Sequence, residues 1–361
     1  MTESQTLSQN DLRQFTENIL KAIGCSHEDA LLAADVLICA DLRGIDSHGV
    51  ARLSGYVRLW KAGRINTKPN VRLVRDKYST GTVDGDAGLG LVIAPKAMEI
   101  AIDKAKSHGS GWIAVQNSNH FGIGAYHAMM ALQHDMIGMS MTNASPLVAP
   151  LNSKERMLGT NPICYAVPAL NEEAFILDMA TSAAANGKLE IAERNGQSVP
   201  LGWLQNNEGN DTSNPKDLKG GGYLLPLGSD KDHGAHKGYG LGAIVDILSG
   251  VLGGANYGPW VPPFVSFLPV KSDLPGKGLG HFLGAMQIDG FEDPEVFKKR
   301  MDHWINRFKN AEPAEGKKVI IHGEPEAALY KTRLTDGIPL VIPVVKDLIA
   351  LAEELKADHP F

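Results

Sequence analysis

The stretch GDAGLGLVIA, residues 85–94, follows a predicted strand and precedes a predicted helix, which is where a dinucleotide-binding fingerprint would stand. Gly88 and Gly90 match its first two glycines, but Ile93 holds the third position, where a bulky side chain prevents the close packing of strand and helix that the motif needs. The acidic residue expected about 20 positions further on is not clearly placed. Two other glycine-rich stretches, GIGAYH and GYGLGA, fail similarly. Any dinucleotide is therefore predicted to bind without a Rossmann turn.

Outward from this stretch, the sequence alternates between predicted strands and helices over about residues 71–145. We expect strands at VRLVRD, TGTVDGD, GWIAVQ and MIGMSMTN. Helices are expected to begin near Pro95, as a first-turn proline, and to run from about Ile123 to His134. Residues 187–235 are polar and glycine-rich, which predicts an excursion over the surface that can still cover a site. The fold class is therefore α/β.

Both ends of the chain are predicted to be helical. The first helix ends at Gly24, and a later one runs from about residue 50 to 62. The tail PVVKDLIALAEELKAD has a strong helical period and is expected to pack beside them. We therefore predict a discontinuous helical domain from residues 1–70 and 330–361, with an α/β cofactor- and substrate-binding region over residues 71–329.

Composition narrows the class of ligand. The chain has 361 residues, a net charge of -6 and a pI near 6.1, which gives no reason to expect nucleic acid or an anionic membrane as partner and favours a small metabolite. The apolar stretch at 239–254 is shorter than the roughly 20 residues that cross a bilayer and is predicted to be a buried helix. The N-terminus lacks the pattern of a secretory signal, so we expect a cytoplasmic protein. The three scattered cysteines match no disulfide framework or zinc motif, and no metal site is predicted.

His120 is a candidate general acid or base. It leaves the end of the predicted strand GWIAVQ among glycines, and ligands of α/β folds bind at the carboxyl ends of strands. A free histidine pKa near 6.5 suits transfer of a proton in either direction. The alternative is a histidine that only satisfies a loop carbonyl. His127, on the following helix, is predicted to be structural.

His48 and Arg52, in DLRGIDSHGVARLSGY at 41–56, are a candidate anion site. They lie one helical turn apart at a predicted helix start, where unpaired N–H groups add positive potential, and arginine presents a planar fork to a carboxylate. Tyr56 follows on the same helical face. In the alternative interpretation Arg52 pairs with a surface carboxylate and His48 only caps the helix.

Three further segments carry backbone donors and short polar side chains that are typical of ligand sites and of ordinary turns alike. The candidates in these segments are Asn143, Ser145, Thr160, Asn161, Asp178, Thr181, Ser182 and, in front of a glycine-rich helix, Lys237.

Taken together, RGIDSHGVARLSGY, NSNHFGIGAYH, GTNP, LDMATS and HKGYGLGAIVDILSGVLGG, in this order and at this spacing, resemble the type 2 malate/L-lactate dehydrogenase family. The resemblance extends from about residue 8 to 350. It implies a homodimeric NAD(P)-dependent oxidoreductase that transfers a hydride between NAD(P)H and C2 of a small 2-oxo or 2-hydroxy acid, on a cofactor fold distinct from the Rossmann type. The family also includes ureidoglycolate dehydrogenase, diketogulonate reductase and reductases of piperideine-2-carboxylate.

The resemblance also implies residue roles. His120 becomes the proton donor and acceptor, while His48 and Arg52 hold the substrate carboxylate with Ser47 and Tyr56 nearby. The residues that it assigns to the cofactor are Ala144, Thr160, Asp178, Met179, Ala180, Lys237, His281, Phe282, Leu283, Gly323, Glu324 and Pro325.

Three alternatives stay open at this point. A cyclic imine 2-carboxylate presents the same carboxylate and an electrophilic C2, so the same residues serve its reduction. A cofactor-free lyase or hydrolase would use His48 and His120 as an acid and base pair. A metabolite-binding protein without catalysis would need neither. The residues fit NAD and NADP equally well, and they leave the identity of the acid open.

Overall fold

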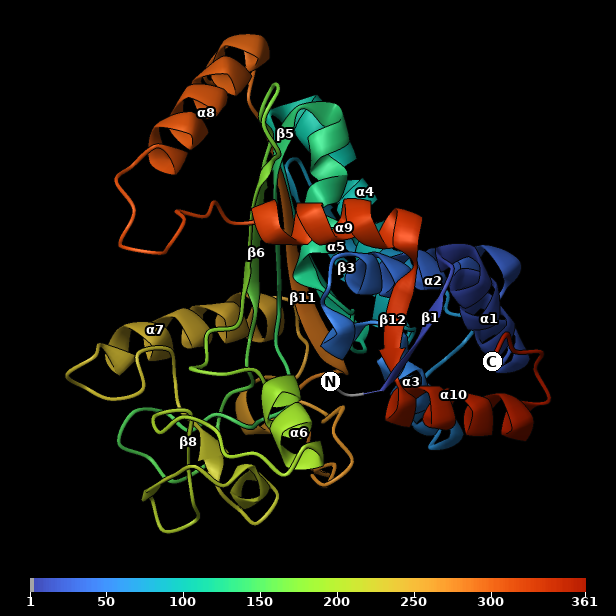
Figure 1. Ribbon diagram of the computed structural model, residues 1–361. Coiled ribbons are helices and arrows are strands. Elements are labelled where there is room, and N and C mark those ends of the chain that lie inside the picture. The colour runs from blue at the N-terminus through green and yellow to red at the C-terminus, as the bar shows by residue number, and fades with distance from the viewer. Residues whose placement is uncertain (1–2) are drawn as a thin grey trace.

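The computed structural model describes residues 3–361 and centres on one seven-stranded sheet (Figure 1). Only β3 and β4 pair in parallel. A strand from late in the chain, β11, lies between β4 and β5. In spatial order the strands are β2 (Arg72–Lys77), β3 (Thr80–Asp84), β4 (Ser110–Ser118), β11 (Leu279–Gln287), β5 (Met136–Thr142), β6 (Ile163–Val167) and β7 (Phe175–Met179).

Helices α4 (Gly90–His108) and α5 (Gly124–Met129) pack against this sheet, and Ile93 is fully buried in the core between them and the strands. The prediction that this helix begins near Pro95 is wrong, because α4 begins at Gly90 and Pro95 lies inside it. A Cβ at position 90 would lie 2.1 Å from the carbonyl oxygen of Asn119. The glycine therefore lets the helix start directly against the loop that carries His120.

The N- and C-terminal segments share one apolar core, as predicted for a discontinuous helical domain. Side chains of Ser8 and Ser26 cap the first two helices, and Gly24 has the left-handed conformation (φ +100°) expected after the first. The elements of this part are β1 (Ser4–Leu7), α1 (Gln9–Ala22), α2 (His27–Leu42), α3 (Leu53–Lys61), α9 (Glu324–Asp336), β12 (Ile338–Val341) and α10 (Ile342–Leu355). Strands β1 and β12 pair antiparallel.

The predicted surface excursion has a small core of its own, which includes Leu189, Leu204 and Leu224. It contains α6 (Asn186–Arg194), a three-stranded sheet of β8 (Leu204–Gln205), β9 (Asp211–Thr212) and β10 (Tyr223–Leu224), and the 3-10 helix η4 (Pro215–Leu218). Figure 1 shows α6 on the side of this excursion that faces α3.

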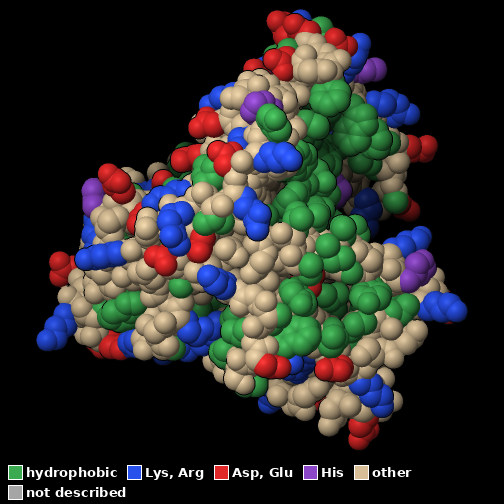
Figure 2. Space-filling view, turned by 180° about the vertical axis from the view of Figure 1, so that it is seen from behind, with side chains coloured by type: hydrophobic (Ala, Val, Ile, Leu, Met, Phe, Trp, Pro, Cys, Tyr) green, Lys and Arg blue, Asp and Glu red, His purple; other side chains and the backbone are tan. Residues whose placement is uncertain are grey.

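The apolar stretch at 239–254 is not a buried helix, which corrects the prediction. It forms most of α7 (Ala235–Asp246) and the π-helical turn η5 (Ile247–Val251), and side chains such as Ile244 and Val251 are 42% and 51% exposed. The helix is covered on only one side, where it contacts the sheet. Figure 2 shows hydrophobic side chains gathered in a band down the back of the molecule. Helix α8 (Pro294–Lys309) projects from the body in Figure 1. No helix within residues 3–361 is both long and apolar enough to span a bilayer.

Candidate active site

The segment that carries His48 and Arg52 is anchored by a buried carboxyl group. It forms two 3-10 turns, η1 (Asp46–His48) and η2 (Val50–Arg52), between α2 and α3. The backbone N–H of Val50 donates to Oδ2 of Asp41 at 2.8 Å, and burial raises the pKa of Asp41 to about 8. A Cβ at Gly49 would lie 1.9 Å from the other carboxyl oxygen, so only glycine fits this contact.

His120 is held through one ring nitrogen. The hydroxyl of Tyr56 lies 2.7 Å from its Nδ1, to which the backbone N–H of Gly122 also donates at 3.4 Å, and Nε2 makes no hydrogen bond within residues 3–361. The ring packs against that of Phe264, with 4.6 Å between the centroids. Burial, followed by the nearby His48 and Arg52, lowers the pKa of His120 well below 6.5, so the imidazole is neutral at pH 7. Nε2 is therefore the nitrogen left to exchange a proton with a ligand.

His48 lies beside His120 in a nearly parallel orientation, with 5.7 Å between ring centroids and 24° between planes. Its Nδ1 is 2.9 Å from Oγ of Ser47. Burial, aided by Arg52, lowers the pKa of His48 to about 4. A neutral His48 can offer a ligand a hydrogen bond but no charge, and the positive charge of the site comes from Arg52.

Arg52 reaches across to the surface excursion. Its Nε donates to the carbonyl oxygen of Ser47 at 2.5 Å, and its Nη2 lies 3.4 Å from Oε2 of Glu190 on α6. The other oxygen of Glu190 accepts a hydrogen bond from Asn186 Nδ2 at 2.8 Å. A Cβ at Gly187 would lie 2.8 Å from Cβ of Ser47, so glycine allows α6 to approach this closely. Arg52 does pair with a carboxylate, but the pair lies inside the site.

These elements enclose a cavity of about 80 Å³. It brings together six residues predicted from the sequence with several that were not, and they come from one end of the sheet, from η1 and η2 and from α6. Five of the predicted residues in its lining are His48, Arg52, His120, Ala144 and Thr160. Ser145 also lines it, and its Oγ accepts from the backbone N–H of Phe264 at 2.8 Å.

A second cavity, of about 240 Å³, collects other residues that the sequence assigned to a cofactor. Asp178, Gly323 and Pro325 line it, and Glu324 begins α9 at its rim. Oδ2 of Asp178 accepts from the backbone N–H of Ala125 at 2.7 Å, and burial raises the pKa of this carboxyl to about 6. Met179 and Ala180 continue the same strand end, both partly exposed.

Other predicted residues lie outside the linings of these two cavities. Lys237 is exposed in the first turn of α7. His281 is fully buried in β11 and hydrogen bonded at both ring nitrogens, to Thr142 Oγ1 at 2.7 Å and Ser118 Oγ at 2.8 Å. Leu283 is also fully buried, while Phe282 stacks on Trp112. These three belong to the packing of the sheet, and their role at a cofactor stays a prediction.

Hydrogen bonds also explain two of the polar candidates. Asn143 is buried and donates to the carbonyl oxygen of Asn256 at 2.7 Å, and Asn161 donates to that of Gly242 at 2.9 Å. Both therefore support the loops around the site. The residues that sequence reasoning missed are Phe264, for which no local signal exists, and Glu190 with Asn186, whose i, i+4 spacing stands inside the polar excursion.

The sequence profile of the malate/L-lactate dehydrogenase family matches residues 7–349, which covers every element of the site. The chain belongs to the malate/L-lactate dehydrogenase family. It is 42% identical to a malate dehydrogenase of Pyrococcus abyssi over 97% of this chain and 94% of the relative. It is 39% identical to an L-sulfolactate dehydrogenase of Methanocaldococcus jannaschii over 94% of both chains.

Solved structures of this dehydrogenase family share the fold. A malate dehydrogenase from Entamoeba histolytica superposes with a TM-score of 0.92 at 32% identity, covering 99% of this chain and all of the other. The predicted family and the predicted non-Rossmann α/β fold are thereby confirmed, and the chain is an oxidoreductase.

Proposed function

We propose that this protein is an NAD(P)-dependent dehydrogenase that interconverts small 2-hydroxy acids and 2-oxo acids. One observation carries the proposal: a neutral His120, held through Nδ1 and free at Nε2, shares a small cavity with the guanidinium of Arg52. One group exchanges a proton, and the other binds the carboxylate next to the reacting carbon.

A nicotinamide cofactor fits the cavity that contains Asp178. A partly buried carboxylate is a suitable acceptor for ribose hydroxyl groups, and Arg43 in the same lining offers positive charge to phosphates. Asp178, Ala144 and Thr160 are among the residues that would hold the cofactor, which would supply or take up the hydride. The proposed cofactor is NAD or NADP.

The chain's own residues then perform the acid–base and positioning chemistry. Arg52 and the donor His48 hold the substrate carboxylate, and this presents the oxygen on C2 to Nε2 of His120. When the 2-hydroxy acid is oxidised, Nε2 takes the hydroxyl proton, which requires the tautomer that carries its proton on Nδ1, within hydrogen-bond distance of the Tyr56 oxygen. Phe264 covers the imidazole and excludes water from one side.

The direction of the reaction sets what His120 must do. The lowered pKa supplies the unprotonated form that oxidation needs. Reduction needs the imidazolium, and a bound substrate carboxylate favours it because the negative charge offsets the repulsion from Arg52. The same residue can therefore serve both directions.

The first experiment is to mix the purified protein with NADH and with NADPH and follow nicotinamide absorbance over pyruvate, oxaloacetate, 2-oxoglutarate, diketogulonate and piperideine-2-carboxylate. Oxidation with a keto acid supports the proposal and identifies the cofactor. Oxidation with the cyclic imine alone would replace it by an imine reductase. No turnover and no nucleotide binding would refute it and favour a cofactor-free reaction.

We also propose that the protein is a homodimer. Exposed apolar side chains on α7 and η5, among them Ile244, Ile247 and Val251, support an interface between two copies, as do the exposed rings of Trp304 and Phe308 on α8. Light scattering on the eluting protein should give twice the mass of the chain, and a monomer at micromolar concentration would contradict this. Location in the cytoplasm stays a prediction.

A further inference from the structure

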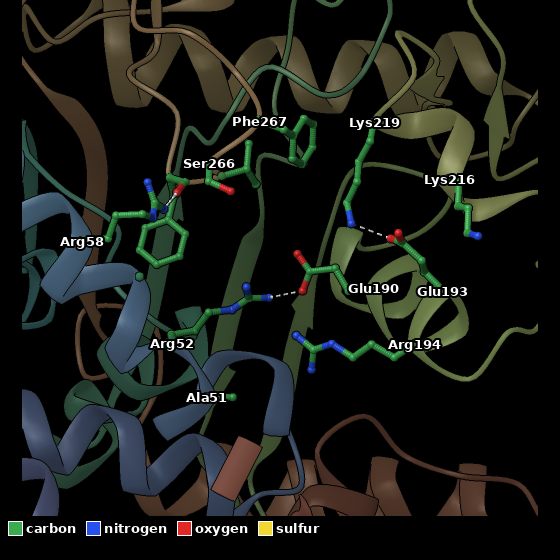
Figure 3. A pocket seen from close by; sticks show the side chains of 13 residues that line it. Ala51, Arg52, Arg58, Glu190, Glu193, Arg194, Lys216, Lys219, Ser266 and Phe267 are labelled. Carbon is green, nitrogen blue, oxygen red and sulfur yellow. Dashed lines mark hydrogen bonds and ion pairs between the residues drawn. The ribbon is translucent and has the colours of Figure 1, made fainter. Parts of the chain in front are cut away.

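The small cavity around His120 opens beside a larger one. This second space has a volume of about 460 Å³ and shares Arg52, Phe264 and Val265 with the first. Figure 3 shows that side chains from α6, from η4 and from Lys219 just after η4 line the side opposite Arg52. A substrate whose carboxylate is bound by Arg52 therefore has room for its distal end here.

The larger cavity carries an excess of positive charge. Five cationic side chains line it, and only two carboxylates, Glu190 and Glu193, oppose them. The carboxylate of the reacting end needs one cation, Arg52. Its Nε and Nη2 are already engaged by Ser47 and Glu190, which leaves three of its five N–H donors for a ligand. The remaining excess favours a second anionic group in the same ligand.

Arg194 is the cation that is free to bind such a group. Lys219 pairs with Glu193 at 2.7 Å, and Arg58 donates to the carbonyl oxygen of Phe264. Lys216 is drawn at the far edge of the cavity and points away from Arg52. Arg194 has no ion pair or side-chain hydrogen bond within residues 3–361, and Figure 3 shows its guanidinium extending back below Glu190, from the side opposite to Arg52.

We propose that Arg194 binds a second anionic group of the substrate, a carboxylate or sulfonate attached to C3, and so selects dianionic 2-oxo acids over pyruvate. This inference rests on the proposed function. Arginine suits the role because its planar fork matches the oxygens of a carboxylate or sulfonate. The pair of Glu190 with Arg52 keeps that arginine oriented toward the reacting end, so each guanidinium takes one anionic group.

The alternative source of negative charge is a phosphate of the cofactor. The cavity with Asp178, however, already offers phosphates a cation, Arg43, and it shares no lining residue with the cavity of Arg194. We therefore assign Arg194 to the substrate, and nucleotide affinity distinguishes the two ligands.

The test is steady-state kinetics of the wild type, Arg194→Gln and Arg194→Lys with oxaloacetate and with pyruvate, together with nucleotide affinity from fluorescence. Lys231→Gln is the matched control, because this exposed lysine of the same excursion removes an equal charge without lining the cavity. In Arg194→Gln we expect the ratio of kcat/KM for oxaloacetate to that for pyruvate to fall about tenfold or more, mainly through KM. Arg194→Lys should recover part of the ratio, because it keeps the charge.

In Arg194→Gln the kcat/KM for pyruvate and the nucleotide affinity should equal those of the wild type. The control Lys231→Gln should match the wild type with both acids. An unaltered ratio in Arg194→Gln would overturn this inference and leave the proposed function standing. An equal loss with both acids would mean that Arg194 acts through Arg52 or the helix, and a loss of nucleotide affinity alone would identify a phosphate site; either result overturns the inference. A wild type that reduces neither oxaloacetate nor pyruvate overturns this inference, and one that reduces none of the 2-oxo acids of the panel refutes the proposed function as well.

Discussion

The hydroxyl of Tyr56 lies 2.7 Å from Nδ1 of His120, and both groups are buried against Phe264. Tyr56 is fully buried in the helical domain, and burial raises the pKa of its hydroxyl above the ordinary value, so the group stays protonated. The helical domain thus holds a neutral hydrogen-bond partner against a ring that is carried by the loop after β4. The orientation of the imidazole depends on how the two parts pack.

Replacing Tyr56 by phenylalanine tests this contact. Tyr56→Phe should lower kcat about tenfold, the value of one lost hydrogen bond. Reduction should slow more than oxidation, since the tyrosine oxygen accepts a hydrogen bond from Nδ1–H of the His120 imidazolium and so stabilises the charged ring. For the same reason the pKa of His120 should fall, and the alkaline limb of the reduction rate should move to lower pH. The pH profiles measure this, and an unmoved limb would argue that Tyr56 only packs.

Removing the imidazole should abolish most of the activity. We expect His120→Ala to lower kcat about 10²- to 10⁴-fold, as for a lost general acid or base. Nucleotide affinity, measured by fluorescence, should survive. His134→Ala, at an exposed histidine outside the cavity, serves as the control. Full activity in His120→Ala would exclude this residue from proton transfer.

The guanidinium of Arg52 should be needed for substrate capture. Lysine keeps the charge but cannot reproduce the bidentate fork, so Arg52→Lys should raise KM and lower kcat/KM about tenfold or more. Arg307→Lys, on the exposed surface of α8, should have no effect. The measurement is initial rate against substrate concentration at saturating cofactor, and an unchanged kcat/KM would refute the clamp.

The close approach of α6 should require glycine. In Gly187→Ala the added methyl group would meet Cβ of Ser47 at 2.8 Å, which displaces the helix that positions Glu190 on Arg52. We expect kcat/KM to fall about tenfold, a typical penalty for a misplaced positioning group, with little change in the melting temperature. Gly290→Ala, where a Cβ meets nothing within 4 Å, is the matched control. Equal kinetics in the two variants would argue against this role for α6.

Asp41 should make stability depend on pH in a definite direction. Its pKa is raised from 3.8 to about 8 by burial, so the folded state binds more protons than the unfolded state between these values. The stability from this group is therefore present below pH 3.8 and is lost as pH rises through about 8. Asp41→Asn removes this pH-dependent component. As pH rises from about 5 to about 9, the free energy of unfolding of the variant, measured with urea, should therefore increase relative to that of the wild type. A constant difference would contradict the shift.

Local sequence patterns predict many of the helices and strands of the fold. The caps at Ser8 and Ser26, the strand pattern of β3, β4 and β5, and the spacing of His48, Arg52 and Tyr56 depend on neighbours in the sequence and could be predicted. The place of β11 could not, because a strand late in the chain pairs with two early ones through contacts that no local pattern encodes.

The same distinction holds for the site. His120 and Arg52 stand in recognisable motifs, whereas Phe264 and Glu190 reach the cavity through the folding of distant loops. The prediction of a buried helix at 239–254 failed for another reason. An apolar composition indicates that a segment favours burial, but it does not show whether the same chain or another molecule buries it.

The pairing of β1 with β12 has a consequence for synthesis. Residues 4–7 can pair only after residues 338–341 have been synthesised. The core of α1, α2 and α3 is complete only when α10 has also been made. At about 5–20 residues per second, a ribosome needs roughly 20–60 s to make the intervening chain. During that time the apolar faces of the first helices lack their final partner, so the nascent chain is a natural client for chaperones until the last helix emerges.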